Sequence, residues 1–140
     1  MTYRGEDILR LIPQRAPFMM VDALEERDGN SAATTLGVER NNYFILPDGT
    51  MAESGIIEHI AQSCSALAGC QALEKQPAGP PVGIIGEVKN FVCHRRPRIG
   101  EQLHTVVTFD MTFGSVTLAT GSCSVGDEPI AEVKLKIFMQ

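Results

Sequence analysis

The chain has 140 residues, of which 44% are apolar and 21% charged, a composition typical of a folded globular protein and not of a disordered or fibrous one. Because the composition does not shift along the chain, we expect one domain over residues 1–140. The net charge of −5 argues against a general nucleic-acid-binding surface.

The first residues give no sign of export or of membrane insertion. Residues 1–5 are largely polar and lack the basic and then apolar pattern of a signal peptide. The chain also has no run of about 18 apolar residues that could span a bilayer. We therefore expect a cytoplasmic protein with no membrane partner.

The N-terminal part of the chain predicts a short helix and a hairpin. Glu6–Ile12 has helical spacing that Pro13 should end. The apolar run Phe18–Val21 predicts a buried strand, and the turn residues 28–30 separate it from a second strand near Ser31–Val38.

A long helix should follow. Thr50 and Glu53 have the spacing of a capping box, which predicts that the helix starts near Thr50. Apolar residues then recur at helical spacing over about 24 residues, and the proline-rich segment Gln76–Pro81 should end the helix. The many Ala, Ser, Gly and Cys residues would let this helix lie close against a curved sheet.

The C-terminal half predicts four consecutive strands, near Gly83–His94, Gln102–Phe113, Val116–Val125 and Ile130–Met139. Val107, Phe109, Met111 and Phe113 alternate with polar residues, as in a half-buried antiparallel strand. The order of elements predicts an α+β fold in which an antiparallel sheet wraps a long central helix.

The cysteines suggest no metal site. Cys64, Cys70, Cys93 and Cys123 lack the CxxC spacing of zinc ligands and lie among apolar or small residues. We expect reduced core thiols, with a disulfide framework as the alternative. The sequence has no glycine-rich phosphate loop either, so we expect neither a metal nor a nucleotide cofactor.

Three motifs resemble those of 3-hydroxyacyl-ACP dehydratases, a hot-dog-fold family. Residues 12–22 read I-P-Q-R-A-P-F-M-M-V-D and resemble the opening L-P-H-R-x-P-F-L-L-V-D. Residues 55–62, G-I-I-E-H-I-A-Q, resemble a helix motif ending I-E-A-x-A-Q, and residues 95–103, R-R-P-R-I-G-E-Q-L, resemble R-R-P-V-x-P-G-D-Q-L. The resemblance implies the hot-dog fold and acyl thioesters on phosphopantetheine, carried by ACP or CoA, as substrates.

The resemblance assigns one catalytic residue and leaves another unfilled. Catalysis in the family uses a glutamate on the central helix, which corresponds to Glu58, and a histidine in G-H-F-P-x-x-P before that helix. Counting back from the helix motif without gaps places Phe44 at the histidine position. From the residues alone, the favoured interpretation of Glu58 is a carboxylate paired with an arginine, because buried charges are usually paired.

Dehydration needs a base for the α-proton and an acid for the departing hydroxyl, so Glu58 supplies only one of two groups. Candidates for the base are His59, His94 and Tyr43, although His59 points about 100° away from Glu58 on an ideal helix. The remaining histidine, His104, lies near the start of a strand, and we assign no role to it.

Other residues are candidates for the site lining and for carrier docking. Tyr43, Phe44 and Gln62 are expected to line the site, and Gly83 and Gly86 could border a thioester channel or simply bend a strand over the helix. His94, Arg95, Arg96 and Arg98 could bind phosphate or an acidic carrier protein, or could be a solvated strand end.

Three functions remain open. The first is a dehydratase subunit that pairs with a histidine-bearing homologue, because family members form dimers whose sites take residues from both subunits. The second is a thioesterase in which Glu58 activates water. The third is an acyl- or carrier-binding subunit without turnover. We expect a homodimer or a heterodimer with a related subunit.

Overall fold

A computed structural model describes residues 2–75 and 83–139. One long helix, one short 3-10 helix and seven strands account for most of these residues. The elements are β1 (Thr2–Arg4), η1 (Gly5–Arg10), β2 (Ala23–Asp28), β3 (Ser31–Gly37), α1 (Glu53–Lys75), β4 (Gly83–Cys93), β5 (Gln102–Phe113), β6 (Val116–Val125) and β7 (Glu128–Met139).

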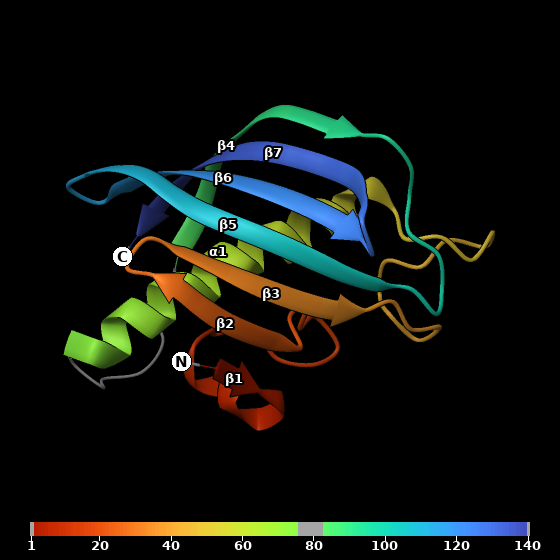
Figure 1. Ribbon diagram of the computed structural model, residues 1–140, viewed down its shortest axis with the longest axis horizontal. Coiled ribbons are helices and arrows are strands. Elements are labelled where there is room, and N and C mark those ends of the chain that lie inside the picture. The colour runs from red at the N-terminus through yellow and green to blue at the C-terminus, as the bar shows by residue number, and fades with distance from the viewer. Residues whose placement is uncertain (1, 76–82, 140) are drawn as a thin grey trace.

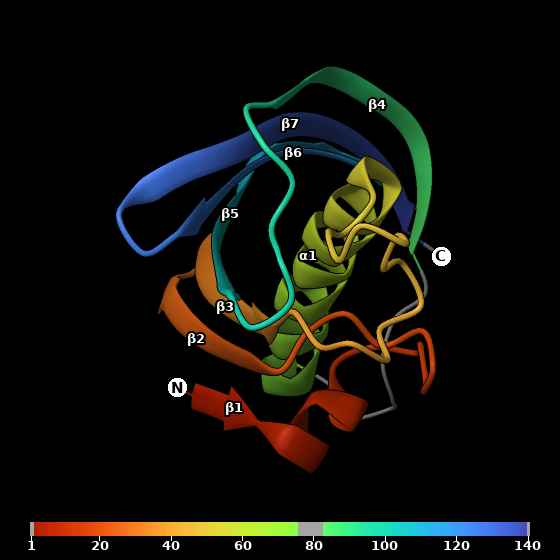
Figure 2. The ribbon, with the colours of Figure 1, turned by 90° about the vertical axis from the view of Figure 1, so that its right-hand side faces the viewer.

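The strands form one antiparallel sheet in the order β1-β2-β3-β5-β6-β7-β4. The sheet curves around α1, as the view along the helix in Figure 2 shows. Figure 1 shows β3 and β5 passing in front of the middle of α1, with β1 and β4 at the two edges of the sheet. This is the hot-dog arrangement, so the fold predicted from the sequence is confirmed.

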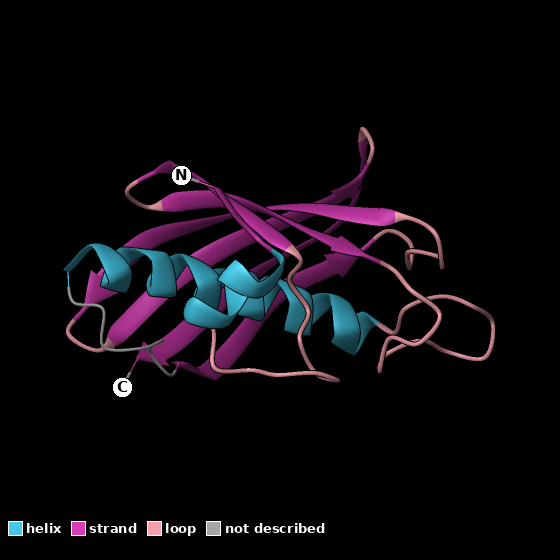
Figure 3. Cartoon of the chain, turned by 90° about the horizontal axis from the view of Figure 1, so that it is seen from below, coloured by secondary structure: helices cyan, strands magenta, loops and turns pink. Residues whose placement is uncertain are grey.

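The core lies between the sheet and α1. Strand residues such as Leu103, Val107 and Val133 are buried against helix residues Ile60 and Leu67. Seen from below in Figure 3, the sheet covers one side of α1 and loops cross the other. The N-terminal loops therefore have direct access to polar side chains on the helix.

Two glycines set how closely the other elements approach α1. A Cβ on Gly121 of β6 would collide with the side chain of Ile60, and one on Gly69 of α1 would collide with the backbone of Leu11. The small residues noted in the sequence thus serve the close packing that they predicted.

The predicted strand at Phe18–Val21 is wrong. This segment is an extended loop, and the hairpin is formed by β2 and β3 instead. Side chains of α1 bind the backbone N–H and C=O of Met20, so these groups are not available to a neighbouring strand. A short apolar run cannot distinguish these two forms of burial.

The predicted capping box is also wrong. α1 begins at Glu53, three residues after Thr50. The Thr50 hydroxyl donates to Asp48 Oδ1 (2.6 Å) and accepts from Arg96 Nε (2.9 Å), so it does not cap the helix. Gln76–Pro81, the predicted end of the helix, lies outside the described residues.

The alternation in β5 holds only as far as Phe109. A bulge between Phe109 and Met111 interrupts the pairing with β6, and beyond it Met111 and Phe113 are exposed. The four cysteines are free thiols, as predicted. Among the described residues, no helix has the length and hydropathy needed to cross a bilayer.

Candidate functional site

A cavity of about 270 Å³ lies between α1 and the ends of β4 and β7. Glu58, Gln62 and Ser65 line it from the helix, and Gln14 lines it from the loop after η1. The rest of its wall is mainly apolar and comprises Ala61, Cys64, Gly83, Ile84, Ile85, Ile137 and Met139. The structure therefore brings together three of the predicted site residues, namely Glu58, Gln62 and Gly83.

Gln62 holds the Glu58 carboxylate and the nearby loop at the same time. Its Nε2 donates to Glu58 Oε2 (2.9 Å) and to the carbonyl oxygen of Phe18 (2.7 Å). Its Oε1 accepts from the backbone N–H of Met20 (2.7 Å). Because all three bonds are made at once, the amide has one orientation and fixes the carboxylate at the cavity wall.

Glu58 has no arginine partner in the described part of the chain, since the recorded ion pairs involve Asp48, Glu101 and Glu128. It is only partly buried. The interpretation of Glu58 as half of a structural ion pair thus finds no support. Its carboxylate faces the cavity and is held by a neutral amide.

His59 is fully buried and points away from the cavity. Its Nδ1–H donates to the carbonyl oxygen of Met20 (2.6 Å), and its Nε2 accepts from the Thr105 hydroxyl (2.8 Å). Burial lowers the pKa of His59 to about 4, so the ring is neutral near pH 7. His59 packs in the core, as the helix geometry predicted, and is not positioned as a base for Glu58.

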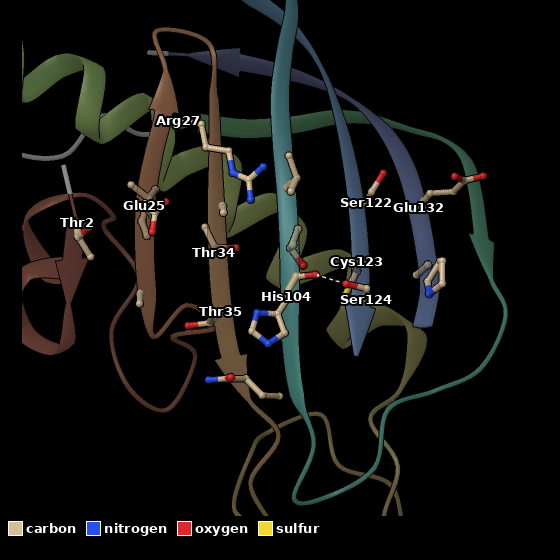
Figure 4. A pocket seen from close by; sticks show the side chains of 18 of the residues that line it. Thr2, Glu25, Arg27, Thr34, Thr35, His104, Ser122, Cys123, Ser124 and Glu132 are labelled. Atoms are coloured by element: carbon tan, nitrogen blue, oxygen red, sulfur yellow. Dashed lines mark hydrogen bonds between the residues drawn. The ribbon is translucent and has the colours of Figure 1, made fainter. Parts of the chain in front are cut away.

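The other two histidines lie on the opposite side of the sheet. His94 and His104 line a shallow groove of about 800 Å³ on its outer face. Figure 4 shows His104 beside Ser124, whose hydroxyl donates to the His104 carbonyl oxygen (3.4 Å). The sheet separates this groove from Glu58. No histidine of the described chain therefore lines the cavity.

Tyr43 and Phe44 lie outside the cavity lining. The Tyr43 ring packs edge-on against Phe18 (4.9 Å between centroids) and Phe44 (5.3 Å). Phe44 also covers the first turn of α1, where a Cβ on Gly55 would lie 2.6 Å from Phe44 Cβ. Phe44, which the ungapped count from the helix motif places at the histidine position, is thus an aromatic ring packed on the start of the helix.

Gly86 does not line the cavity either. A Cβ at this position would collide with the ring of Phe138, its neighbour on β7, so the glycine leaves room for that ring. Gly86 thus fits the alternative prediction, in which the glycine affects the course of the strand, because the pairing of β4 with β7 is interrupted between Ile85 and Glu87. Gly83 has both properties, because it borders the cavity and a Cβ there would lie 2.9 Å from Met139 Sδ.

The arginine cluster is partly neutralised within the chain. Arg95 pairs with Glu101 (2.8 Å) and Glu128 (3.0 Å), and these bonds raise its pKa. Arg96 pairs with Asp48 (3.0 Å). Arg98 is exposed and makes no recorded ion pair among the described residues. Of the three arginines in this cluster, Arg98 is therefore the one most available to an external anion.

The cavity can offer one carboxyl group for proton transfer. Burial raises the pKa of Cys64 to about 12, so this thiol stays protonated and is no nucleophile. Gln14 and Ser65 were not among the predicted site residues. A possible signal for Gln14 was its place in the first motif, where the family usually has histidine. Nothing in the sequence marked Ser65.

Comparison with known proteins shows the family to which the chain belongs. Residues 6–140 match the family described as ApeP-like, ApeP dehydratase. The chain is 30% identical over 135 residues to 3-hydroxyacyl-[acyl-carrier-protein] dehydratase FabZ of Halalkalibacterium halodurans, covering 93% of this chain and 94% of that protein. The FabZ of Thermoanaerobacter pseudethanolicus is 26% identical over 139 residues, or 96% of each chain.

Solved structures show the same fold. The dehydratase heterocomplex ApeI:P from Xenorhabdus doucetiae contains a chain that superposes with a TM-score of 0.88 at 18% identity, covering 95% of this chain and 90% of that one. A hypothetical thioesterase from Streptococcus pneumoniae, solved with coenzyme A, gives a TM-score of 0.67 at 7% identity over 84% of each chain.

Proposed function

This chain belongs to the ApeP-like dehydratase family, and from that premise we propose that it is one subunit of a heteromeric 3-hydroxyacyl-ACP dehydratase. Its function is dehydratase-like, in agreement with the family match and with the FabZ relatives. The proposal adds that Glu58 is the catalytic carboxyl and that a related hot-dog subunit supplies the histidine.

One observation carries the proposal: Glu58, the candidate carboxyl group, lines a cavity that no histidine of the described chain lines. Gln62 holds the Glu58 carboxylate at the cavity wall, as a group that acts as the acid would require. The sequence motif places Phe44 at the histidine position, where it packs on the start of α1, and the chain's own histidines lie in the core or on the outer face of the sheet. A site made of residues from two different subunits would be complete.

The two groups would share the reaction as follows. The partner's histidine removes the proton from C2 of the 3-hydroxyacyl thioester, and the resulting electron pair forms the C2–C3 double bond. The protonated Glu58 carboxyl gives its proton to the C3 hydroxyl, which leaves as water. The enoyl thioester is released, and the histidine returns its proton to the carboxylate through solvent.

The free edge of the sheet at β4 supports the proposal that a partner subunit binds. Among the described residues, β4 pairs with β7 alone, and it exposes Ile84, Val88 and Val92. An edge strand with exposed apolar side chains is a common site for pairing with another chain. The ApeI:P neighbour is itself a heterocomplex, which agrees with this arrangement.

We propose that the carrier protein docks at Arg98, the exposed end of the arginine cluster. Arg98 shares a surface hollow with Arg95 and Arg96, whose charges are already compensated by neighbouring carboxylates. His94 opens instead onto the outer groove. We expect Arg98 to contribute more to binding of an acidic carrier than the other three residues.

The test is turnover of a 3-hydroxyacyl-ACP by the chain alone, by a histidine-bearing homologue from the same organism, and by their mixture. Mass spectrometry would follow the enoyl product and the free acid. We expect the mixture to form enoyl product much faster than either chain alone. Glu58→Gln in this chain should lower that rate by about 10²–10⁴-fold.

Other results would contradict the proposal in distinguishable ways. Free acid lost on Glu58→Gln would identify a thioesterase, the second function left open by the sequence. A stable complex that turns over equally well with Glu58→Gln would make this chain a binding subunit. A chain that forms enoyl product at full rate alone would show that no partner is needed.

A further inference from the structure

Two buried polar atoms without partners belong to residues that line the same cavity. Among the described residues, Gln14 Oε1 and Ser65 Oγ are the buried side-chain oxygen or nitrogen atoms that lack a hydrogen bond. Both residues line the cavity that contains Glu58. A buried polar atom without a partner destabilises the fold, so a ligand that bonds to both atoms would remove that cost.

The two atoms lie beyond Glu58 along the helix. Ser65 follows Glu58 by seven residues on the same face of α1, which corresponds to about 10 Å along the axis. The loop that carries Gln14 runs antiparallel to α1, from Leu11 beside Gly69 to Phe18 beside Gln62. Gln14 therefore lies near the level of Ser65.

The cavity wall between Glu58 at one end and Gln14 and Ser65 at the other is apolar. Ala61, Cys64, Ile85 and Ile137 line this part of the cavity, and Cys64 is uncharged because burial raises the pKa of its thiol to about 12. The cavity volume of about 270 Å³ is several times the roughly 30 Å³ that one water occupies in the liquid. It can hold part of a chain-like molecule.

We propose that Gln14 and Ser65 determine acyl-chain specificity by binding a hydrogen-bonding group, such as a hydroxyl, carried by the acyl chain well beyond the thioester. The inference rests on the proposed function, because it takes Glu58 to mark the reactive end. The Gln14 amide oxygen accepts a hydrogen bond from that group, and the Ser65 hydroxyl donates one to it or accepts one from it.

This arrangement would select against plain alkyl chains. An alkyl end placed between Gln14 and Ser65 leaves both polar atoms without partners, whereas a hydroxyl end satisfies them. Sites built to hydrogen-bond a substrate group discriminate strongly against analogues that lack it, because their own polar atoms are then left unpaired. The discrimination therefore comes from the cavity wall and not from Glu58.

The test is calorimetric binding of two unreactive probes to the complex of this chain with its histidine-bearing partner. The probes are acyl-pantetheine amides of equal length without a 3-hydroxyl, one ending in a methyl group and the other in a hydroxyl. A series of lengths locates the polar end. At the best length we expect the hydroxyl probe to bind about tenfold more tightly.

Gln14→Met and Ser65→Ala should each reduce this preference and should strengthen binding of the methyl probe. Gln102→Met and Ser122→Ala are the matched controls, because both residues are exposed on the outer face of the sheet. These controls should keep the wild-type preference. Thermal melting of every variant establishes that its fold is intact.

The wild-type measurement decides the inference even if a variant fails to fold. Equal affinity for the two probes at every length, or preference for the methyl probe, overturns it and leaves the dehydratase proposal standing. A hydroxyl preference that survives both cavity substitutions also overturns the assignment to Gln14 and Ser65. A hydroxyl preference in a complex that forms no enoyl product supports the inference while contradicting the proposed function.

Discussion

Gln62 links the candidate catalytic group to the fold. Its three hydrogen bonds, to Glu58, Phe18 and Met20, connect α1 with the preceding loop. Gln62→Met removes these bonds and leaves backbone groups of Phe18 and Met20 without partners, so we expect a loss of about 2–4 kcal/mol in stability. Urea unfolding measures it, and Gln102→Met, an exposed substitution, should change stability by less than about 0.5 kcal/mol.

The neutral state of His59 should make stability depend on pH. The pKa of His59 is about 4 in the folded chain and 6.5 as a free side chain. The unfolded state therefore binds more protons between these values, and stability falls as the pH drops through this window. The full contribution of His59 is present above pH 6.5, and about 3 kcal/mol of it is lost by pH 4.

Comparison of wild type with His59→Gln isolates this effect, because carboxylates also titrate in the same range. The difference in unfolding free energy between the two proteins should shrink as the pH falls from 6.5 to 4. Ser122→Ala, which replaces a side chain that does not titrate and lies on the outer face of the sheet, should retain the wild-type slope. A constant difference between wild type and His59→Gln would contradict a neutral buried ring.

At the scale of elements, the approach of α1 to β6 depends on the missing side chain of Gly121. Gly121→Ala would force its Cβ into Ile60 and should destabilise the fold by about 1–3 kcal/mol. Ile60→Ala removes the colliding atoms, so the double variant should lose less than the sum of the two single losses. Ser122→Ala, whose side chain is exposed, serves as the control.

The sequence predicted the elements better than their ends. Period-two patterns located β5 and β7, and small residues around an apolar stripe located α1. The helix start was wrong because the Thr50 hydroxyl found partners in Asp48 and Arg96, which lies far along the chain. The Phe18–Val21 strand was wrong because the bonds of Met20 go to helix side chains.

The site could be predicted only in part for a similar reason. Glu58 and Gln62 are one helical turn apart, so local spacing brings them together. Gln14 and Ser65 meet the same cavity from segments that no local pattern connects. Ion pairing of Arg95 with Glu128 likewise depends on the tertiary fold, so the sequence could not show that the charge of Arg95 is compensated.

At the scale of the whole molecule, the exposed edge of β4 should govern association. Val88 is 43% exposed on this strand, and Val88→Lys would place a charge where the proposed partner pairs. We expect weaker binding to the histidine-bearing subunit with little change in the melting temperature of the isolated chain. Sedimentation velocity measures the complex, and Ser122→Lys, outside this edge, should leave it intact.

Phe44 has a consequence for the number of working sites. A two-fold pair of hot-dog subunits has two cavities, and in the proposed arrangement each subunit reaches into the cavity of the other. The cavity with Glu58 would receive the partner's histidine, whereas the other would meet the Phe44 ring. Only one of the two cavities in such a pair would contain both the carboxyl group and the histidine. A covalent inhibitor that requires both groups would therefore bind at one molecule per pair of chains.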